Sequence, residues 1–103
     1  MNKIKLNNLE LEVESYNKNT YFTGETIIST AACTVRTSNM TAVNTLAEAP
    51  VTLIQIRVNN ELVYDLPNIN AKIESINEYL ATDHMNVTIN LNFNAGDANE
   101  NNS

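Results

Sequence analysis

Apolar and charged residues alternate strictly in the first fourteen residues, and this pattern predicts a β-hairpin. Its two arms, Lys3–Leu6 and Leu9–Glu14, flank the pair Asn7-Asn8. Successive side chains of a strand point to opposite faces, so a period of two separates a buried face from a solvent face. The two-residue turn needs positive φ at both central residues, which asparagine tolerates better than most residues. The residues assigned to the buried faces are Ile4, Leu6, Leu9, Leu11 and Val13.

A second hairpin is predicted around Asn59-Asn60, with arms at Val51–Val58 and Glu61–Leu66. The first arm is apolar on both faces, which is typical of a central strand or of a strand covered by a partner protein. Pro67-Asn68 is expected to end the second arm, since proline cannot donate a hydrogen bond to the ladder. The candidate protein interface of this hairpin comprises Leu53, Ile54, Ile56, Val58 and Tyr64.

Two further segments have the pattern of strands. Thr26–Arg36 is rich in β-branched residues, and its second half alternates as expected for a half-buried strand. A polar stretch at Ser15–Thr20 and a turn at Thr23–Glu25 precede it. Met85–Phe93 has the cleanest alternation in the chain, with a large apolar residue at every second position from Val87 onward.

The hydrophobic period changes after Pro67. The apolar residues there are Ile69, Ile73, Ile76 and Leu80. At about 100° per residue they form one narrow stripe, which predicts an amphipathic helix over Ile69–Leu80 that ends at Thr82-Asp83-His84. For residues 38–49, a short helix and a structured loop both remain open, because the segment is short and rich in threonine.

These elements predict an α+β fold in the form of a mainly antiparallel β-sheet. The sheet has five to six strands, with one amphipathic helix near the C-terminus, and a small β-sandwich is the alternative layout. The length of 103 residues suits a single domain, here residues 1–93. Residues 94–103 contain no large apolar side chain and are expected to form a flexible C-terminal tail.

Composition excludes several classes of partner. The chain carries six Lys and Arg against twelve Asp and Glu, a net charge of −6, which disfavours nucleic acid because phosphate binding depends on basic residues. No apolar run approaches the roughly 20 residues of a membrane-spanning helix, and the N-terminus does not resemble a secretion signal. We therefore expect no membrane association and no secretion. Asparagine occurs 19 times and glycine twice, so asparagine is expected at turns that need positive φ.

Residues capable of catalysis or metal binding are sparse. The single histidine, His84, adjoins Asp83, and this pair is interpreted as a turn or helix-end feature in preference to a catalytic one. The single cysteine, Cys33, lies on the apolar face of its strand and is interpreted as a small buried hydrophobe; one cysteine excludes an internal disulfide. The acidic row Glu10, Glu12 and Glu14 is read as a solvated face, and the tyrosines as packing at the edge of the core.

We accordingly predict no catalytic residue, no metal site and no cofactor, and a chain that is not an enzyme. An enzyme would need an active site completed across an oligomer interface. A domain without catalytic groups but with uniformly apolar strands is typical of a protein that binds or builds, since such strands can extend another sheet or close a homo-oligomer.

Three stretches resemble small virion structural proteins of tailed bacteriophages. They are LELEVESYNKNTYFTG at Leu9–Gly24, TLIQIRVNNELVYDL at Thr52–Leu66, and Asn70–Phe93. The resemblance implies a capsid decoration or auxiliary protein, or a head–tail joining protein, located in the virion after synthesis in the host cytoplasm. It also implies other virion proteins as partners, namely the major capsid or the connector and tail proteins, and many copies or a homo-oligomer. The alternative, from the net charge of −6, is a small acidic inhibitor or mimic that binds a basic surface on a host protein.

Overall fold

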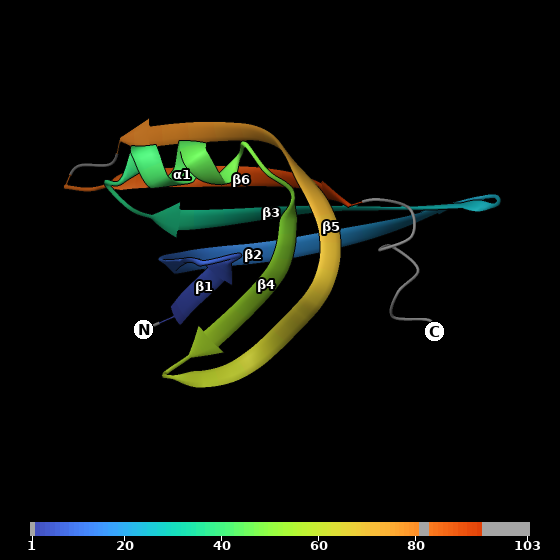
Figure 1. The fold of residues 1–103 in the computed structure, drawn as a ribbon, viewed down its shortest axis with the longest axis horizontal. Helices are drawn as coiled ribbons and strands as arrows, with labels where there is room; N and C mark the ends of the chain where they lie inside the picture. Colours follow the sequence, from blue (N-terminus) through green and yellow to red (C-terminus); the bar gives the residue numbers. More distant parts are fainter. Residues whose placement is uncertain (1, 81–82, 94–103) are drawn as a thin grey trace.

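The computed structural model describes residues 2–80 and 83–93, in which six antiparallel strands close into a barrel (Figure 1). Its elements are β1 (Asn2–Leu6), β2 (Leu9–Thr23), β3 (Thr26–Arg36), α1 (Met40–Leu46), β4 (Val51–Val58), β5 (Glu61–Leu80) and β6 (Met85–Phe93). Around the barrel the order is β1-β2-β3-β6-β5-β4, and β4 pairs with β1 to close it. The mainly antiparallel sheet is confirmed, as a barrel and not as a sandwich. The predicted tail, residues 94–103, lies outside the described residues.

Both hairpins form at the predicted asparagine pairs. Asn59 and Asn60 have φ values of 53° and 70°, as expected; in the first turn only Asn7 is positive, at 57°. The Asn7 side chain also ties this turn to the start of β4. Its Oδ1 accepts hydrogen bonds from the backbone N–H of Thr52 at 2.8 Å and from the Thr52 hydroxyl at 3.1 Å, and its Nδ2 donates to the Pro50 carbonyl at 3.1 Å.

The predicted C-terminal helix is wrong, because Ile69–Leu80 forms the second half of β5. Its pairing with β6 places Ile73 opposite Leu91 and Ile76 opposite Ile89, although three residues separate Ile73 from Ile76. The register shifts between Ile73 and Ser75, so Glu74 is an extra residue in a β-bulge. This bulge returns Ile76 to the inner face and produces an apolar spacing that imitates a helix.

The prediction that Pro67-Asn68 ends the second arm of the hairpin is wrong. The two residues form a bend inside β5. The register with β4 jumps here: Leu53 lies opposite Pro67, whereas Val51 lies opposite Ala71. Asn68 has a φ of 58°, so the chain turns sharply at a site where the ladder is already interrupted and proline is tolerated. Beyond the bend, Ala71 pairs with Phe93 of β6. β5 thus curves around the barrel and joins β4 to β6 (Figure 1).

The helix of the fold lies at Met40–Leu46, within the segment for which helix and loop were both open. Asn39 caps it, because its side chain accepts a hydrogen bond from the N–H of Ala42 at 3.2 Å. Val43 and Leu46 are buried and belong to the core. No helix among the described residues is both long and apolar enough to span a membrane.

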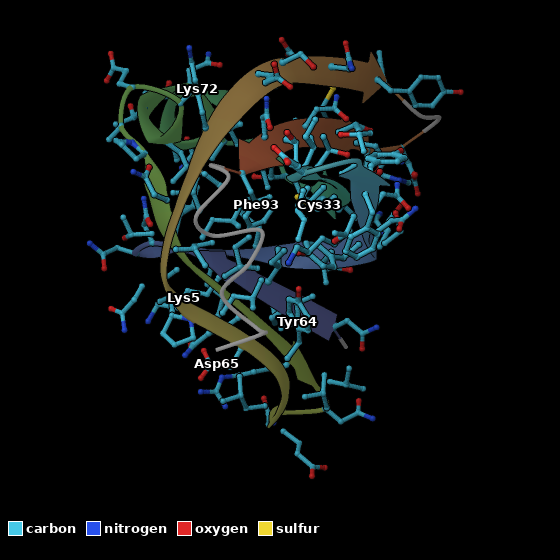
Figure 2. The ribbon with its side chains drawn as sticks, turned by 90° about the vertical axis from the view of Figure 1, so that its right-hand side faces the viewer. Lys5, Cys33, Tyr64, Asp65, Lys72 and Phe93 are labelled. Carbon is cyan, nitrogen blue, oxygen red and sulfur yellow. The ribbon has the colours of Figure 1, made fainter. Side chains whose placement is uncertain are left out.

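The core fills the barrel with aliphatic side chains from all six strands and α1. Figure 2 looks along the barrel and shows Cys33 and Phe93 inside the ring of strands. The largest fully buried side chains are Ile4, Leu6, Ile54, Ile89 and Leu91.

Candidate protein-interaction surface

The hairpin of β2 and β3 extends beyond the barrel as a two-stranded projection. β1 pairs with β2 only as far as Glu12, and β6 pairs with β3 only from Thr30. Within the part of the chain that the structure describes, residues 20–29 therefore pair only with each other, and we call this part the arm. It ends in a turn at Gly24, whose φ is 61°, and it extends along the long axis to the end of the molecule opposite α1 (Figure 1).

The arm carries exposed apolar side chains on both faces. Phe22 lies opposite Ile27 on one face, and Tyr21 lies opposite Ile28 on the other. Tyr21, Phe22 and Ile28 are 52%, 73% and 42% exposed, respectively. At the base of the arm, Ser29 is fully buried and its hydroxyl lies 2.9 Å from that of Thr20. Because these apolar side chains are exposed and do not pack on the core of their own chain, the arm has the properties of an element completed by a second protein.

The residues of the predicted interface on β4 and β5 differ in their burial. Ile54 is fully buried, whereas Leu53, Ile56, Val58 and Tyr64 are half-buried. The Tyr64 hydroxyl lies 3.2 Å from that of Tyr16, with ring centroids 5.1 Å apart, so these rings join β5 to β2. Over Ile54–Val58, β4 pairs with β1 on one side and with β5 on the other. Part of the apolar character of β4 is explained by the core, because Val51 and Ile54 belong to it and Ile56 packs against it.

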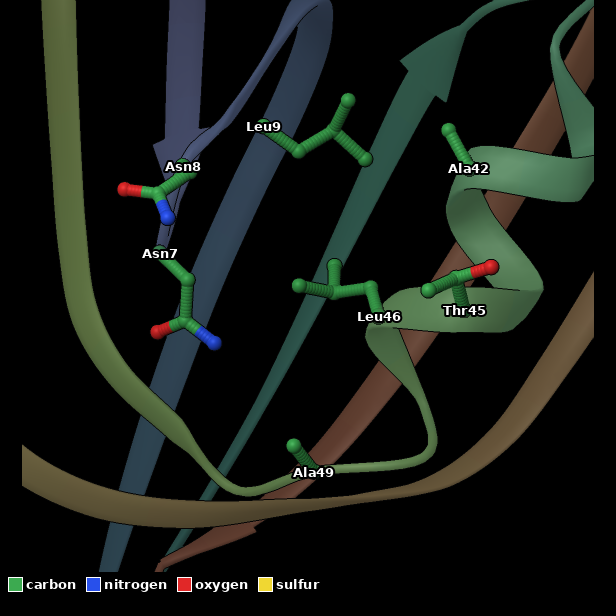
Figure 3. A pocket seen from close by; sticks show the side chains of 7 residues that line it. All are labelled: Asn7, Asn8, Leu9, Ala42, Thr45, Leu46 and Ala49. Carbon is green, nitrogen blue, oxygen red and sulfur yellow. The ribbon is translucent and has the colours of Figure 1, made fainter.

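An apolar hollow of about 390 Å³ lies between α1 and the β1–β2 turn. Leu9 and Leu46 point toward one another across it, and Ala42 and Ala49 complete its apolar lining (Figure 3). α1, which borders this hollow, and the arm tip lie at opposite ends of the molecule (Figure 1).

His84, directly before β6, contacts two carboxylates. Its Nδ1 lies 2.6 Å from Oδ1 of Asp83, and its Nε2 lies 3.8 Å from Oε1 of Glu14, the bulged residue of β2. The hydrogen bond with His84, and then its charge, hold the pKa of Asp83 below its ordinary value. Among the described residues, no serine, threonine or cysteine forms a hydrogen bond with this imidazole. The described residues thus hold no nucleophile against this imidazole.

The acidic row of β2 is interleaved with basic residues. Glu10 and Glu12 lie opposite Lys5 and Lys3 of β1, and Glu12 also lies opposite Arg36 of β3. The surface therefore alternates in sign, which is a poor match to a uniformly basic target. Within residues 2–80 and 83–93, no group of three or more His, Cys, Asp or Glu is arranged to hold a metal ion.

Cys33 is fully buried on the inner face of β3, as the sequence indicated. Burial raises the pKa of its thiol to about 12, from an ordinary value of 9.0. Burial, followed by the hydrogen bond with Tyr64, likewise raises the pKa of Tyr16.

These raised pKa values predict that alkaline pH destabilises the fold. Above pH 9.0 the unfolded chain loses the thiol proton while the folded chain retains it, so the free energy of unfolding falls until the pH reaches about 12. The expected slope is about 1 kcal/mol per pH unit. Urea unfolding of the wild type and of Cys33→Ala through this window measures it: the variant should show a shallower slope from pH 9.0 onward. Equal slopes would contradict a buried, protonated thiol.

Sequence reasoning missed the arm and misjudged two of the four tyrosines. Tyr16 and Tyr64 pack at the edge of the core, but Tyr21 is 52% exposed and Tyr79 is 67% exposed. The available signal was Tyr21-Phe22 directly before a glycine turn, because large apolar residues at a hairpin tip cannot reach the core of their own sheet.

Comparison of the chain with protein-family models, with curated proteins and with solved structures gives no match.

Proposed function

We propose that the chain is a non-enzymatic structural component of a bacteriophage virion that docks on other virion proteins through the arm. The role that we propose in the virion is that of a capsid decoration or auxiliary protein, or of a head–tail joining protein. The observation that carries the docking role is the exposure of Tyr21, Phe22 and Ile28 on a projection that adds nothing to its own core. The virion setting rests on the resemblance of Leu9–Gly24, Thr52–Leu66 and Asn70–Phe93 to small virion proteins.

Two features of the structure support docking through this element. The arm is anchored to the barrel by the continuous strands β2 and β3, so its position is defined before a partner binds. Its tip also presents apolar side chains on two faces, which suits insertion between neighbouring surfaces.

The test is incorporation into particles of the phage that encodes the chain. We expect mass spectrometry of purified particles to find the wild type in many copies. The double substitution Tyr21→Ser with Ile28→Ser should reduce incorporation at least tenfold, because it removes the apolar pair from one face of the arm. Thermal unfolding of the purified variant should remain close to that of the wild type, since both side chains are exposed.

A matched control is the double substitution Tyr79→Ser with Leu80→Ser at the end of β5. These side chains are 67% and 73% exposed but lie outside the arm. We expect this variant to be incorporated normally. Absence of the wild type from purified particles, or normal incorporation of the arm variant, would overturn the proposal.

A further inference from the structure

The outer edge of β2 lacks a neighbouring strand over nine residues. β3 pairs with β2 as far as Thr23, but on the other side β1 stops at Glu12, and the bulge at Glu14 follows. Among the described residues, no strand pairs with this side of Ser15–Thr23, which we call the open edge. Every second residue of an edge strand directs its N–H and C=O groups outward, so the open edge is a template for another strand.

The open edge has few of the features that block strand addition. It contains no proline and no acidic residue, and its one charged residue, Lys18, lies with its Nζ 5.0 Å from the centroid of the Phe93 ring. All the glutamates of β2 precede it, at Glu10, Glu12 and Glu14. In a chain of net charge −6, the open edge is therefore a stretch where a second copy can approach without opposing carboxylates.

We propose that two copies of the chain pair through their open edges, antiparallel, about a two-fold axis at Asn19. Asn19 is the middle residue of the nine, so this register overlaps the two open edges completely. Because the axis passes through a residue, the outward N–H and C=O groups of each strand meet outward groups of the other over the whole ladder. The interface is isologous and closes at a dimer. The inference rests on the proposed function in one respect: the β2–β3 hairpin that is proposed to dock on virion proteins is also the hairpin that pairs with a second copy of the chain.

Side chains also match in this register. Tyr16 comes opposite the partner's Phe22, and by symmetry Phe22 comes opposite the partner's Tyr16. The 73% exposed Phe22 thereby gains a cross-strand aromatic contact beside the Tyr16–Tyr64 pair. Lys18 comes opposite the partner's Thr20, so no like charges lie directly opposite. Tyr21 and Ile28 stay on the other face, available for the virion partner.

The expected affinity is modest. A standard stable interface buries about 800 Å² per partner, whereas this one consists of a nine-residue ladder and two aromatic pairs. We expect a dissociation constant in the micromolar range, about 1–100 µM. Added salt should strengthen the dimer, because it screens the repulsion between two chains of charge −6. An acidic inhibitor bound to a basic target would respond to salt in the opposite direction.

The test is sedimentation equilibrium of the full chain, as the wild type and as two variants with opposite charges in place of Asn19. The wild type should be a dimer at high concentration and a monomer at low concentration. Asn19→Glu and Asn19→Lys each bring like charges opposite one another on the axis and should each weaken the dimer at least tenfold. An equimolar mixture of the two variants should recover association as a heterodimer. Asn77→Glu, an exposed position on β5, is the control for added charge and should remain dimeric.

A wild type that is monomeric at every concentration would overturn the inference, as would an Asn19→Glu variant that dimerises normally or a mixture that fails to associate. Particle analysis separates this failure from failure of the proposed function. A monomeric chain that is still found in particles overturns the dimer alone, and a dimeric chain that is absent from particles overturns the virion role alone.

Discussion

Ile54→Asp should leave the chain unfolded at room temperature. The Ile54 side chain is fully buried between β1 and β5, opposite Leu6 on one side and Leu66 on the other. Aspartate there must either bury an unpaired carboxylate or take up a proton, and in both cases it leaves a cavity. We expect a loss of more than about 4 kcal/mol in the free energy of unfolding, comparable to the whole stability of a small domain.

Far-UV circular dichroism and urea unfolding measure this loss. The control is Leu62→Asp in the neighbouring strand β5, where the side chain is 40% exposed; its free energy of unfolding should change by no more than about 1 kcal/mol. A stably folded Ile54→Asp chain would place this side chain at the surface and restore Ile54 as a contact for a partner. Docking is thus better tested on the arm, where substitutions spare the core.

Deletion of Lys72 should abolish cooperative folding, whereas deletion of Glu74 should be tolerated. Ala71 and Ile73 both point into the barrel, with the exposed Lys72 between them. Removing Lys72 makes two inward residues adjacent, so one half of β5 must turn its apolar side chains to solvent. Removing Glu74 only deletes the extra residue of the bulge, and Ile73 and Ile76 keep their inward orientation in a regular ladder.

Urea unfolding and amide NMR spectra of the two deletion variants measure the contrast. We expect dispersed spectra and a loss of about 2 kcal/mol or less for the Glu74 deletion, within the usual range for a single change. The Lys72 deletion should give collapsed spectra without a cooperative transition. In a helix each deletion would rotate the following residues by about 100°, so equal damage from both would contradict the strand and its bulge.

Patterns between close neighbours in the sequence were sufficient to predict most of the strands. The asparagine pairs at Asn7 and Asn59 mark both hairpin turns, because positive φ is a local property that the residue type reveals. The alternation in Met85–Phe93 is likewise local, since each inward side chain of β6 packs in the same barrel. The buried state of Cys33 followed from its neighbours in the same way.

Interruptions of the ladder could not be predicted, because a bulge depends on the partner strand. Ile73 and Ile76 have the spacing of a helix, and only the positions of Leu91 and Ile89 on β6 show that an extra residue lies between them. Pro67 resembled a strand end because the sequence does not show that the ladder with β4 is broken there. The arm escaped prediction for a related reason: Ser15–Thr20 is a polar stretch without apolar alternation, and the points at which the neighbouring strands stop are a property of the whole barrel.

The strand order also has a consequence for the order of folding. β1, β2 and β3 form one meander and β4, β5 and β6 form another, each joined by ladders between neighbours in sequence. Among residues 2–80 and 83–93, two ladders connect the halves, with Ile4 opposite Ile56 and Cys33 opposite Ile89. Contacts so distant along the chain carry the largest loop-closure entropy and form late. The two meanders should therefore form first, and the closure of these two seams should set the folding rate.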